Sequence, residues 1–248
     1  MMRQHCPLAV ALVCIAAFNP LWADDDKAAW EKKTYADAKK NQLPYRLLAP
    51  EKLDAKQTYP LVVFLHGSGS RGTDNEKQLG GAVFQFATKE NRKKPPCFVV
   101  APQCSKKEPL DYWAKTVDNG IVMGMIKDVE KNHPIDSKRL YVTGLSDGGW
   151  GVWALLEKYP DQLAAAVPVC GRGEPDAARK FANVPIWVFH GAKDNIEPVK
   201  SSREMVAALK KVGGSPKYTE YPDEGHNAWD RAYRDAKLFE RLFAQKRN

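Results

Sequence analysis

The sequence is poor in cysteine and histidine, with five of each among its 248 residues. It contains neither a paired C-x-x-C motif nor a cluster of histidines, so we expect no structural zinc and no other metal. Cys97, Cys104 and Cys170 lie beyond the N-terminal segment, and an odd number leaves at least one free thiol in a monomer. Cys97 and Cys104 flank one expected strand and are too far apart to bridge. A bridge between Cys104 and Cys170, which both follow strands, stays open.

Long apolar runs are also missing, apart from one near the N-terminus. Residues 8–18 form an apolar run that is too short to span a bilayer as a stable helix. Arg3 gives this region a basic start, and Ala23 precedes three aspartates. This pattern predicts a secretory signal over residues 1–23 and a secreted or periplasmic protein, with a retained N-terminal anchor as the alternative. We expect no membrane insertion after cleavage.

The chain has no concentrated patch of positive charge, although its formal net charge is +8. Lysine and arginine are spread over the whole length and mixed with aspartate and glutamate, and no basic run is interleaved with aromatic residues. This distribution favours a solvated basic surface over a nucleic-acid partner. An attraction to anionic polymers stays open. Repeats and low-complexity segments are absent, and residues 24–248 fit one domain.

Short apolar runs alternate with helical patterns along this domain. We expect strands at residues 61–65, 98–101, 140–143, 164–169, 186–189 and 217–221. The central runs do not alternate with polar residues, which indicates strands buried on both faces. Strands separated by helices pair in parallel through right-handed crossovers.

Helical spacing of apolar residues predicts helices at residues 117–132, 198–212 and 232–244. Residues 43–48 look like an antiparallel edge strand. The expected fold class is therefore α/β, with a mostly parallel, doubly wound sheet of six to eight strands and helices on both faces. In such sheets the active groups gather at the carboxyl ends of the strands.

The most informative motif is G-x-S-x-G at residues 144–148. It lies between the expected strand at 140–143 and an apolar, aromatic helical segment. A sharp turn from strand to helix strains the serine backbone and exposes its hydroxyl, so Ser146 is the candidate nucleophile. The alternative is a β-turn whose serine caps the following helix.

A serine nucleophile needs a histidine base, and His226 is our candidate. It lies in a turn-forming loop after the last expected strand, where its side chain can reach over the sheet edge. His66 and His190 end internal strands, where a histidine more often fixes a loop through backbone hydrogen bonds.

The base in turn needs a carboxylate that orients it. Asp194 follows the strand at 186–189 and can accept a hydrogen bond from the imidazole N–H and stabilise the imidazolium. A helix N-cap is the alternative role for Asp194. Asp223 and Glu224 are less suitable candidates, since they lie very near His226 in the sequence. The order Ser, Asp, His along the chain is the one expected of an α/β-hydrolase.

Backbone N–H groups must stabilise the developing oxyanion. We expect one from Asp147, at the start of the helix after the serine. The other should come from the loop at residues 66–69, where we favour Ser68 and then Gly69. A glycine-rich turn without a partner is the alternative. A phosphate-binding loop is disfavoured, because no Lys-Ser or Lys-Thr follows at the required spacing.

With these motifs the chain resembles the α/β-hydrolase superfamily over nearly all of its predicted mature length. More narrowly it is similar to secreted esterases described as predicted peptidases or phospholipase/carboxylesterase-like proteins, which are related to polyhydroxybutyrate-depolymerase-like and feruloyl-esterase-like enzymes. The matching segments are residues 43–47, 64–75, 99–104, 141–146, 188–194 and 221–227. The resemblance implies hydrolysis of carboxylic esters without metal or organic cofactor.

Asp147 departs from the commonest pattern of these relatives, which have methionine after the serine. Its carboxylate would oppose a nearby oxyanion if it pointed inward, so we expect it to point aside or to find a partner. It could also bind a substrate ammonium group, which keeps aminopeptidase or amino-ester activity open.

The sequence thus predicts a serine hydrolase that cleaves carboxylic esters, such as acetyl, feruloyl or other polysaccharide-linked esters, through an acyl-enzyme. Trp150, Trp113 and Trp229 lie near the proposed loops and are candidates to line the substrate site, with core or rim packing as the alternative. A serine peptidase is the second prediction. A catalytically dead scaffold that binds glycans is the third.

Overall fold

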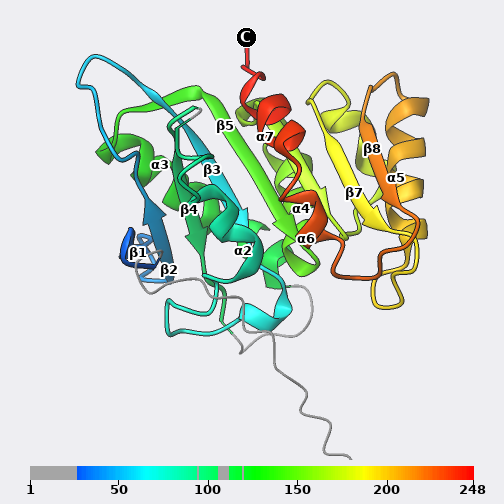
Figure 1. Cartoon of the computed structure of the whole chain (residues 1–248), viewed down its shortest axis with the longest axis horizontal. Coiled ribbons are helices and arrows are strands. Elements are labelled where there is room, and N and C mark those ends of the chain that lie inside the picture. Colours follow the sequence, from blue (N-terminus) through cyan, green and yellow to red (C-terminus); the bar gives the residue numbers. More distant parts are fainter. Residues whose placement is uncertain (1–26, 94, 106–111, 119) are drawn as a thin grey trace, which may run out of the picture.

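An eight-stranded sheet forms the centre of the computed structural model, which describes residues 27–93, 95–105, 112–118 and 120–248 (Figure 1). The predicted signal sequence lies outside the described residues. The strands are β1 (Trp30–Ala36), β2 (Gln42–Leu48), β3 (Tyr59–Leu65), β4 (Phe98–Pro102), β5 (Ile135–Leu145), β6 (Ala165–Val169), β7 (Trp187–Gly191) and β8 (Lys217–Tyr221). Their order in the sheet is β1-β2-β4-β3-β5-β6-β7-β8.

Strand β1 pairs antiparallel with β2, and β2 pairs antiparallel with β4. From β4 across β3 to β8, all neighbouring strands of the sheet are parallel. The prediction of a mostly parallel sheet is confirmed. The prediction that residues 43–48 form the edge is wrong, because β1 lies outside β2. Residues of β1 are mostly polar and half or fully exposed, with only Trp30 buried, so no apolar run marks this strand.

Both faces of the central strands are buried, as their unbroken apolar runs predict. In β3, Leu61, Val63 and Leu65 belong to the hydrophobic core on one side of the sheet. Val62 and Phe64 belong to the core on the other side. This alternation follows from the two-residue period of a strand.

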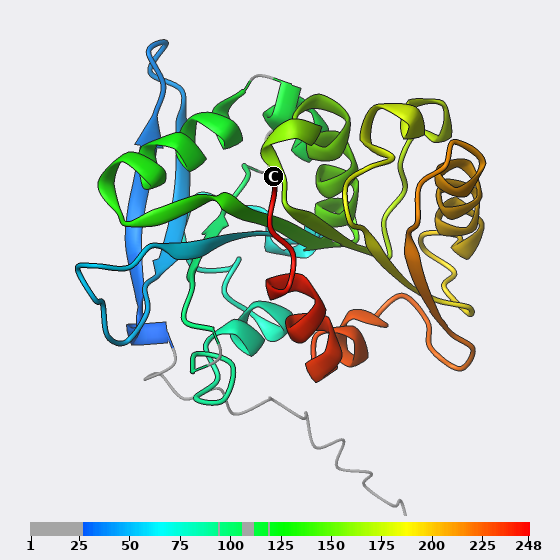
Figure 2. The same cartoon turned by 90° about the horizontal axis from the view of Figure 1, so that it is seen from above.

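Helices cover both of these faces (Figure 2). One face carries α2 (Tyr112–Asp118), α3 (Ile121–Asn132), α4 (Asp147–Lys158), α5 (Val199–Lys211) and the 3₁₀ helix η4 (Pro175–Phe181). The other face carries the 3₁₀ helix η2 (Gly81–Phe86), α6 (Trp229–Ala232) and α7 (Ala236–Phe243). Two short 3₁₀ helices, η1 (Ser68–Ser70) and η3 (Pro160–Gln162), lie in loops.

Two of the predicted helices differ in their bounds. The segment predicted at 117–132 is divided between α2 and α3, because Gly120 takes a left-handed conformation with φ of 76°. The segment predicted at 232–244 is divided between α6 and α7, and the side chain of Asp235 caps α7 by accepting a hydrogen bond from the backbone N–H of Lys237. Each division thus coincides with one residue, the left-handed Gly120 before α3 and the capping Asp235 before α7.

The three cysteines of the described chain are all buried and free. The bridge between Cys104 and Cys170 that the sequence left open is therefore not formed. Burial raises the thiol pKa of Cys97 and of Cys170 to about 12, so both thiols stay protonated at neutral pH. Among the described helices, none has the length and apolar character needed to cross a membrane.

Replacing Leu238 by alanine should destabilise the fold. This side chain is fully buried on α7 against the second face of the sheet. We expect a loss of about 2–5 kcal/mol in the free energy of unfolding, measured by urea denaturation. The matched control is Glu240→Ala at an exposed position of the same helix, which should change stability by less than about 0.5 kcal/mol. Equal effects of the two substitutions would contradict the packing of α7.

Candidate active site

The turn between β5 and α4 carries Ser146 in a strained conformation. Its φ is 56° and its ψ is −121°, a region that side-chain-bearing residues rarely occupy. The backbone N–H of Ser146 donates to the carbonyl of Val169 on β6 at 2.9 Å, and the carbonyl of Ser146 accepts from Trp150 at 3.2 Å. The surrounding backbone therefore fixes the strained residue from both the sheet and the helix.

The two glycines of the motif make this turn possible by allowing close contacts. A Cβ atom at Gly144 would lie 2.5 Å from the carbonyl oxygen of Gly148. A Cβ atom at Gly148 would lie 2.0 Å from the carbonyl oxygen of Leu65, at the end of β3. Because any side chain would collide with backbone at both positions, the helix starts tight against the ends of the strands.

Ser146, His226 and Asp194 form one hydrogen-bonded row. His226 Nε2 lies 2.9 Å from Ser146 Oγ, and His226 Nδ1 lies 2.7 Å from Asp194 Oδ2. The three side chains come from the loops after β5, β8 and β7. This arrangement allows Nδ1–H to donate to the carboxylate while Nε2 accepts from the hydroxyl. The structure thus brings together three residues that lie up to 80 positions apart in the sequence.

The carboxylate of Asp194 is held by further donors. Its Oδ1 accepts from the backbone N–H groups of Ile196 and Glu197, both at 2.9 Å. His190 Nε2 lies 3.1 Å from Oδ2 and 2.9 Å from the carbonyl of Glu197, while Nδ1 lies 2.7 Å from the hydroxyl of Ser202. Nε2 faces two oxygen atoms that can only accept, so it is the nitrogen that donates to this loop. His190 therefore fixes the loop of Asp194, as expected of a histidine that ends an internal strand.

His66 fixes the other loop of the site in the same way. Its Nδ1–H donates to the carbonyl of Gly67 at 2.7 Å, and its Nε2 accepts from the N–H of Cys104 at 3.1 Å. Burial lowers the pKa of His66 to about 4, so the ring is neutral near pH 7. The loop that follows lies against the nucleophile, because a Cβ atom at Gly67 would be 3.4 Å from the Cβ of Ser146.

Ser68 and Gly69 open the 3₁₀ helix η1 on this loop. Within the part of the chain that the structure describes, no hydrogen bond takes up their backbone N–H groups. Both residues line the cavity into which Ser146 opens. They are therefore placed to donate to a ligand beside Ser146.

The carboxylate of Asp147 points to a cationic partner. Its Oδ2 accepts from Arg71 Nη2 at 2.8 Å and from Arg71 Nε at 3.2 Å. The side chain of Asp147 is 6% exposed and that of Arg71 is 11% exposed. The sequence-based expectation that this carboxylate finds a partner is met by a residue to which the sequence assigned no role.

A cavity of about 380 Å³ contains the exposed parts of Ser146 and His226. Apolar groups, among them Phe64, Ala82, Leu145 and the indole of Trp229, make up much of its lining. The Trp229 ring meets the His226 ring edge-on, with 5.0 Å between centroids. Trp229, unlike the other two predicted tryptophans, therefore lines the cavity beside His226.

The two other tryptophans predicted to line the substrate site do not line this cavity. Trp113 is fully buried in the core, and its indole N–H donates to the carbonyl of His66 at 2.8 Å. Trp150 donates its indole N–H to Glu197 Oε2 at 3.1 Å, and its ring is covered by the guanidinium of Arg172 at 3.8 Å. Trp113 is thus a packing residue, and Trp150 supports the loop of Asp194.

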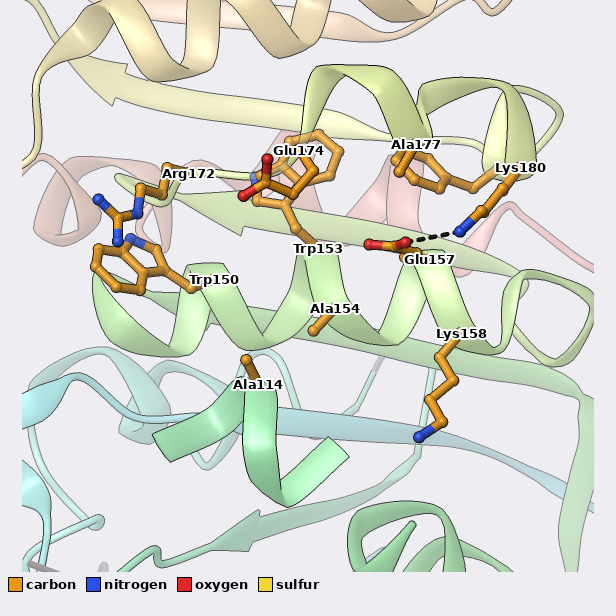
Figure 3. A pocket seen from close by; sticks show the side chains of 12 residues that line it. Ala114, Trp150, Trp153, Ala154, Glu157, Lys158, Arg172, Glu174, Ala177 and Lys180 are labelled. Carbon is orange, nitrogen blue, oxygen red and sulfur yellow. Dashed lines mark hydrogen bonds and ion pairs between the residues drawn. The ribbon is translucent and has the colours of Figure 1, made fainter. Parts of the chain in front are cut away.

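Trp150 and Arg172 belong to a second cavity of about 730 Å³ beside α4 (Figure 3). Two other lining residues, Glu157 and Lys180, form an ion pair with 2.7 Å between Oε1 and Nζ. Trp153 and Phe181 contribute to its wall but are almost completely buried. Arg172 therefore occupies one face of the Trp150 ring within this cavity.

Asp194 also belongs to a group of three possible metal ligands. Donor atoms of Cys170, His190 and Asp194 lie within 4.8 Å of one another, and all three residues are buried. Asp194 already accepts from His226 and from two backbone N–H groups, and both ring nitrogens of His190 have partners. This donor set is therefore engaged in holding the Asp194 carboxylate and does not fit a metal ion.

Sequence reasoning missed Arg71, Gln103 and Glu197. Gln103 Nε2 donates to the carbonyl of Ser70 at 3.1 Å, and its Oε1 accepts from the N–H of Asn75 at 2.6 Å, which braces the loop after η1. The acidic residue after the nucleophile was a usable signal for Arg71, because a buried carboxylate requires a cation or several donors. No comparable signal marks Gln103 or Glu197.

Comparison with known proteins identifies the family to which the chain is similar. A model of the phospholipase/carboxylesterase family matches residues 105–243, which is more than half of the chain. The chain is 26% identical over 201 residues to a probable carboxylesterase of Oryza sativa subsp. japonica, covering 69% of this chain and 83% of that protein. It is 31% identical over 81 residues to a bifunctional acetylxylan esterase/xylanase of Neocallimastix patriciarum, covering 33% of this chain and 12% of that protein.

Among solved structures, the crystal structure of a thermostable esterase superposes with a TM-score of 0.83 and 34% identity. The match covers 90% of this chain and 64% of that one, which confirms the α/β-hydrolase fold. This chain thus spans less than two thirds of the esterase and about an eighth of the bifunctional enzyme.

The buried neutral ring of His66 should make stability depend on pH. Its folded pKa of about 4 lies below the ordinary value of 6.5, so the unfolded chain takes up the proton first as the pH falls. Stability that is present above pH 6.5 is therefore lost between pH 6.5 and 4, by up to about 3 kcal/mol. Urea denaturation of wild type and His66→Gln across this range measures the effect.

The His66→Gln variant should lose most of this dependence of stability on pH. His133→Gln serves as the comparison, because that ring is only half-buried and its pKa is also lowered by burial. It should remove less of the pH dependence than His66→Gln. Identical pH profiles for wild type and His66→Gln would contradict the assignment.

Proposed function

The chain belongs to the phospholipase/carboxylesterase family of α/β-hydrolases, and from this we propose that it hydrolyses carboxylic esters with Ser146 as nucleophile. The observation that carries the proposal is the hydrogen-bonded row from Ser146 Oγ through His226 to Asp194, with contacts of 2.9 Å and 2.7 Å. The strained backbone of Ser146 presents the hydroxyl to a cavity, as a nucleophile requires.

In the proposed reaction, Ser146 Oγ attacks the ester carbonyl carbon while His226 Nε2 takes the hydroxyl proton. Asp194 holds the ring through Nδ1 and stabilises the imidazolium that forms. His226 then gives the proton to the leaving alcohol, and an acyl-enzyme remains on Ser146. Water repeats the sequence, with His226 as base, and releases the carboxylic acid.

Backbone N–H groups stabilise the charge that develops on the carbonyl oxygen. We assign the amide of Asp147, at the first residue of α4, and the unpaired amides of Ser68 and Gly69 to this role. The helix dipole adds to the effect of Asp147, because the N-terminus of α4 points to the site. Removal of one such donor typically costs two to three orders of magnitude in kcat, or about 3–4 kcal/mol.

The cavity supports a small acyl group. Its volume of about 380 Å³ and its largely apolar wall, to which Trp229 contributes, suit an acetyl group or a flat aromatic acid such as a feruloyl group. The similarity to an acetylxylan esterase/xylanase supports an ester carried by a polysaccharide. The basic N-terminal region and the apolar run at residues 8–18 support export, so we place this hydrolysis outside the cytoplasm.

Peptidase activity is less well supported. An aminopeptidase must bind the substrate ammonium, and Asp147 was the acidic residue considered for that role. Its carboxylate is buried and paired with Arg71, so it is not presented to a substrate. An amide also needs stronger protonation of its leaving group than an ester does. We therefore propose ester hydrolysis as the main activity.

Replacing Ser146 by alanine should abolish hydrolysis of p-nitrophenyl acetate, with a loss of at least about 10⁴-fold in kcat. The variant should also fail to react with a fluorophosphonate probe, while wild type is labelled. Ser137→Ala, at an exposed position on β5, is the control and should behave as wild type. Full activity or full labelling of the Ser146 variant would remove this residue as the nucleophile.

Matched substrates should separate the two hydrolase activities. We expect wild type to cleave a p-nitrophenyl ester with a kcat/KM at least about 10³-fold above that for the p-nitroanilide of the same acyl group. An aminoacyl anilide with a free amino group should give no advantage over the acetylated compound, because Asp147 is occupied by Arg71. A clear preference for the free amine would contradict this account and favour an aminopeptidase.

A further inference from the structure

We propose that the buried ion pair of Arg71 and Asp147 holds the two halves of the oxyanion hole at a fixed spacing, with both side chains acting as positioning residues. This inference rests on the proposed function, because it concerns the backbone donors of that reaction. It gives a role to the one acidic side chain that stands next to the nucleophile.

The ion pair joins the two segments that supply the donors. Arg71 directly follows η1, which carries the N–H groups of Ser68 and Gly69, and Asp147 directly follows Ser146. Arg71 Nη2 and Nε lie 2.8 Å and 3.2 Å from the same oxygen of Asp147, so the guanidinium grips that atom with two donors. Seventy-six positions separate the two residues in the sequence.

The loop of η1 is also held by two residues that follow β4, Gln103 and Cys104. Gly72 N–H donates to the carbonyl of Cys104 at 2.8 Å, and Gln103 donates to the carbonyl of Ser70 at 3.1 Å. These contacts fix the loop relative to the sheet but give it no bond to α4. Arg71 supplies that connection, because its side chain crosses from the loop to the first residue of the helix.

Charge gives the pair a second effect on the same site. An unpaired carboxylate at residue 147 would stand one residue from the nucleophile and oppose the negative charge that forms on the substrate oxygen. The guanidinium of Arg71 cancels this charge and turns the carboxylate away. Loss of Arg71 should therefore harm catalysis more than loss of the charge on Asp147.

A gain in folding stability does not by itself explain why this ion pair is buried. Removing two charges from water is costly, and apolar replacements of a buried ion pair are often neutral or stabilising. Positioning is a better reason, because hydrogen bonds to the oxyanion depend on sub-ångström placement of donors. A loop that can drift from α4 would lose part of this stabilisation even when the fold is intact.

The test compares Arg71→Lys, Arg71→Met, Asp147→Asn and the double variant R71M/D147M with wild type. For each, kcat and KM are measured on an aryl ester and on its thionoester, in which sulfur replaces the carbonyl oxygen. A well-placed oxyanion hole favours oxygen over the larger, weaker acceptor sulfur. A fall in the ratio of the two rates therefore reports on donor placement and not on folding.

We expect Arg71→Met to lower kcat on the oxoester by about 10- to 100-fold with little change in KM, and to lower the oxoester/thionoester ratio. Asp147→Asn should show a smaller loss of kcat, and the kcat of Arg71→Lys should lie between those of Arg71→Met and wild type. The double variant, which removes both charges of this ion pair together, should fold but keep the low kcat and the low ratio. Arg203→Met breaks a surface ion pair between α5 and Glu220 of β8, outside the site, and should match wild type.

Wild-type kcat and ratio in the double variant, or in both Arg71→Lys and Asp147→Asn, would overturn the inference and leave the pair a purely structural role. The proposed function fails by a different result: wild type would show no ester hydrolysis and no fluorophosphonate on Ser146. The two failures are therefore distinguishable in the same set of experiments.

Discussion

The hydrogen bond between Ser146 Oγ and His226 Nε2 is the contact on which the account of this protein depends. It forms only because Ser146 is held with positive φ at the end of β5 and because the loop after β8 carries His226 back over the sheet edge. In the proposed mechanism neither residue acts without the other. There, Asp194 supports the proton transfer from Ser146 to His226, and the backbone donors stabilise the oxyanion that forms after it.

Two further histidines, His66 and His190, hold the loops on the two sides of the site in place. His66 ties the end of β3 to Cys104, just beyond β4, and His190 ties the end of β7 to the loop of Asp194. Both rings are buried, and both nitrogens of each ring have hydrogen-bond partners. The sheet sets the direction of each loop, and these rings then fix its position, so the catalytic groups sit on rigid supports.

The sequence predicted the parallel sheet and the row of Ser146, His226 and Asp194, because each of these residues follows an apolar strand and parallel strands end at one edge. It could not predict β1, whose mostly polar residues carry no apolar run, or the burial of Trp113, which depends on a bond to a distant carbonyl. Arg71 was missed for the same reason: its partner comes close only after the fold has formed.

Formation of an acyl-enzyme on Ser146 can be measured directly as the mass of the protein quenched in acid during turnover of p-nitrophenyl acetate. We expect a fraction of the protein to gain the mass of one acetyl group, and peptide mapping to place that group on Ser146. An unmodified Ser146 under steady turnover, or an acetyl group that maps to another residue and is turned over at the rate of hydrolysis, would contradict it.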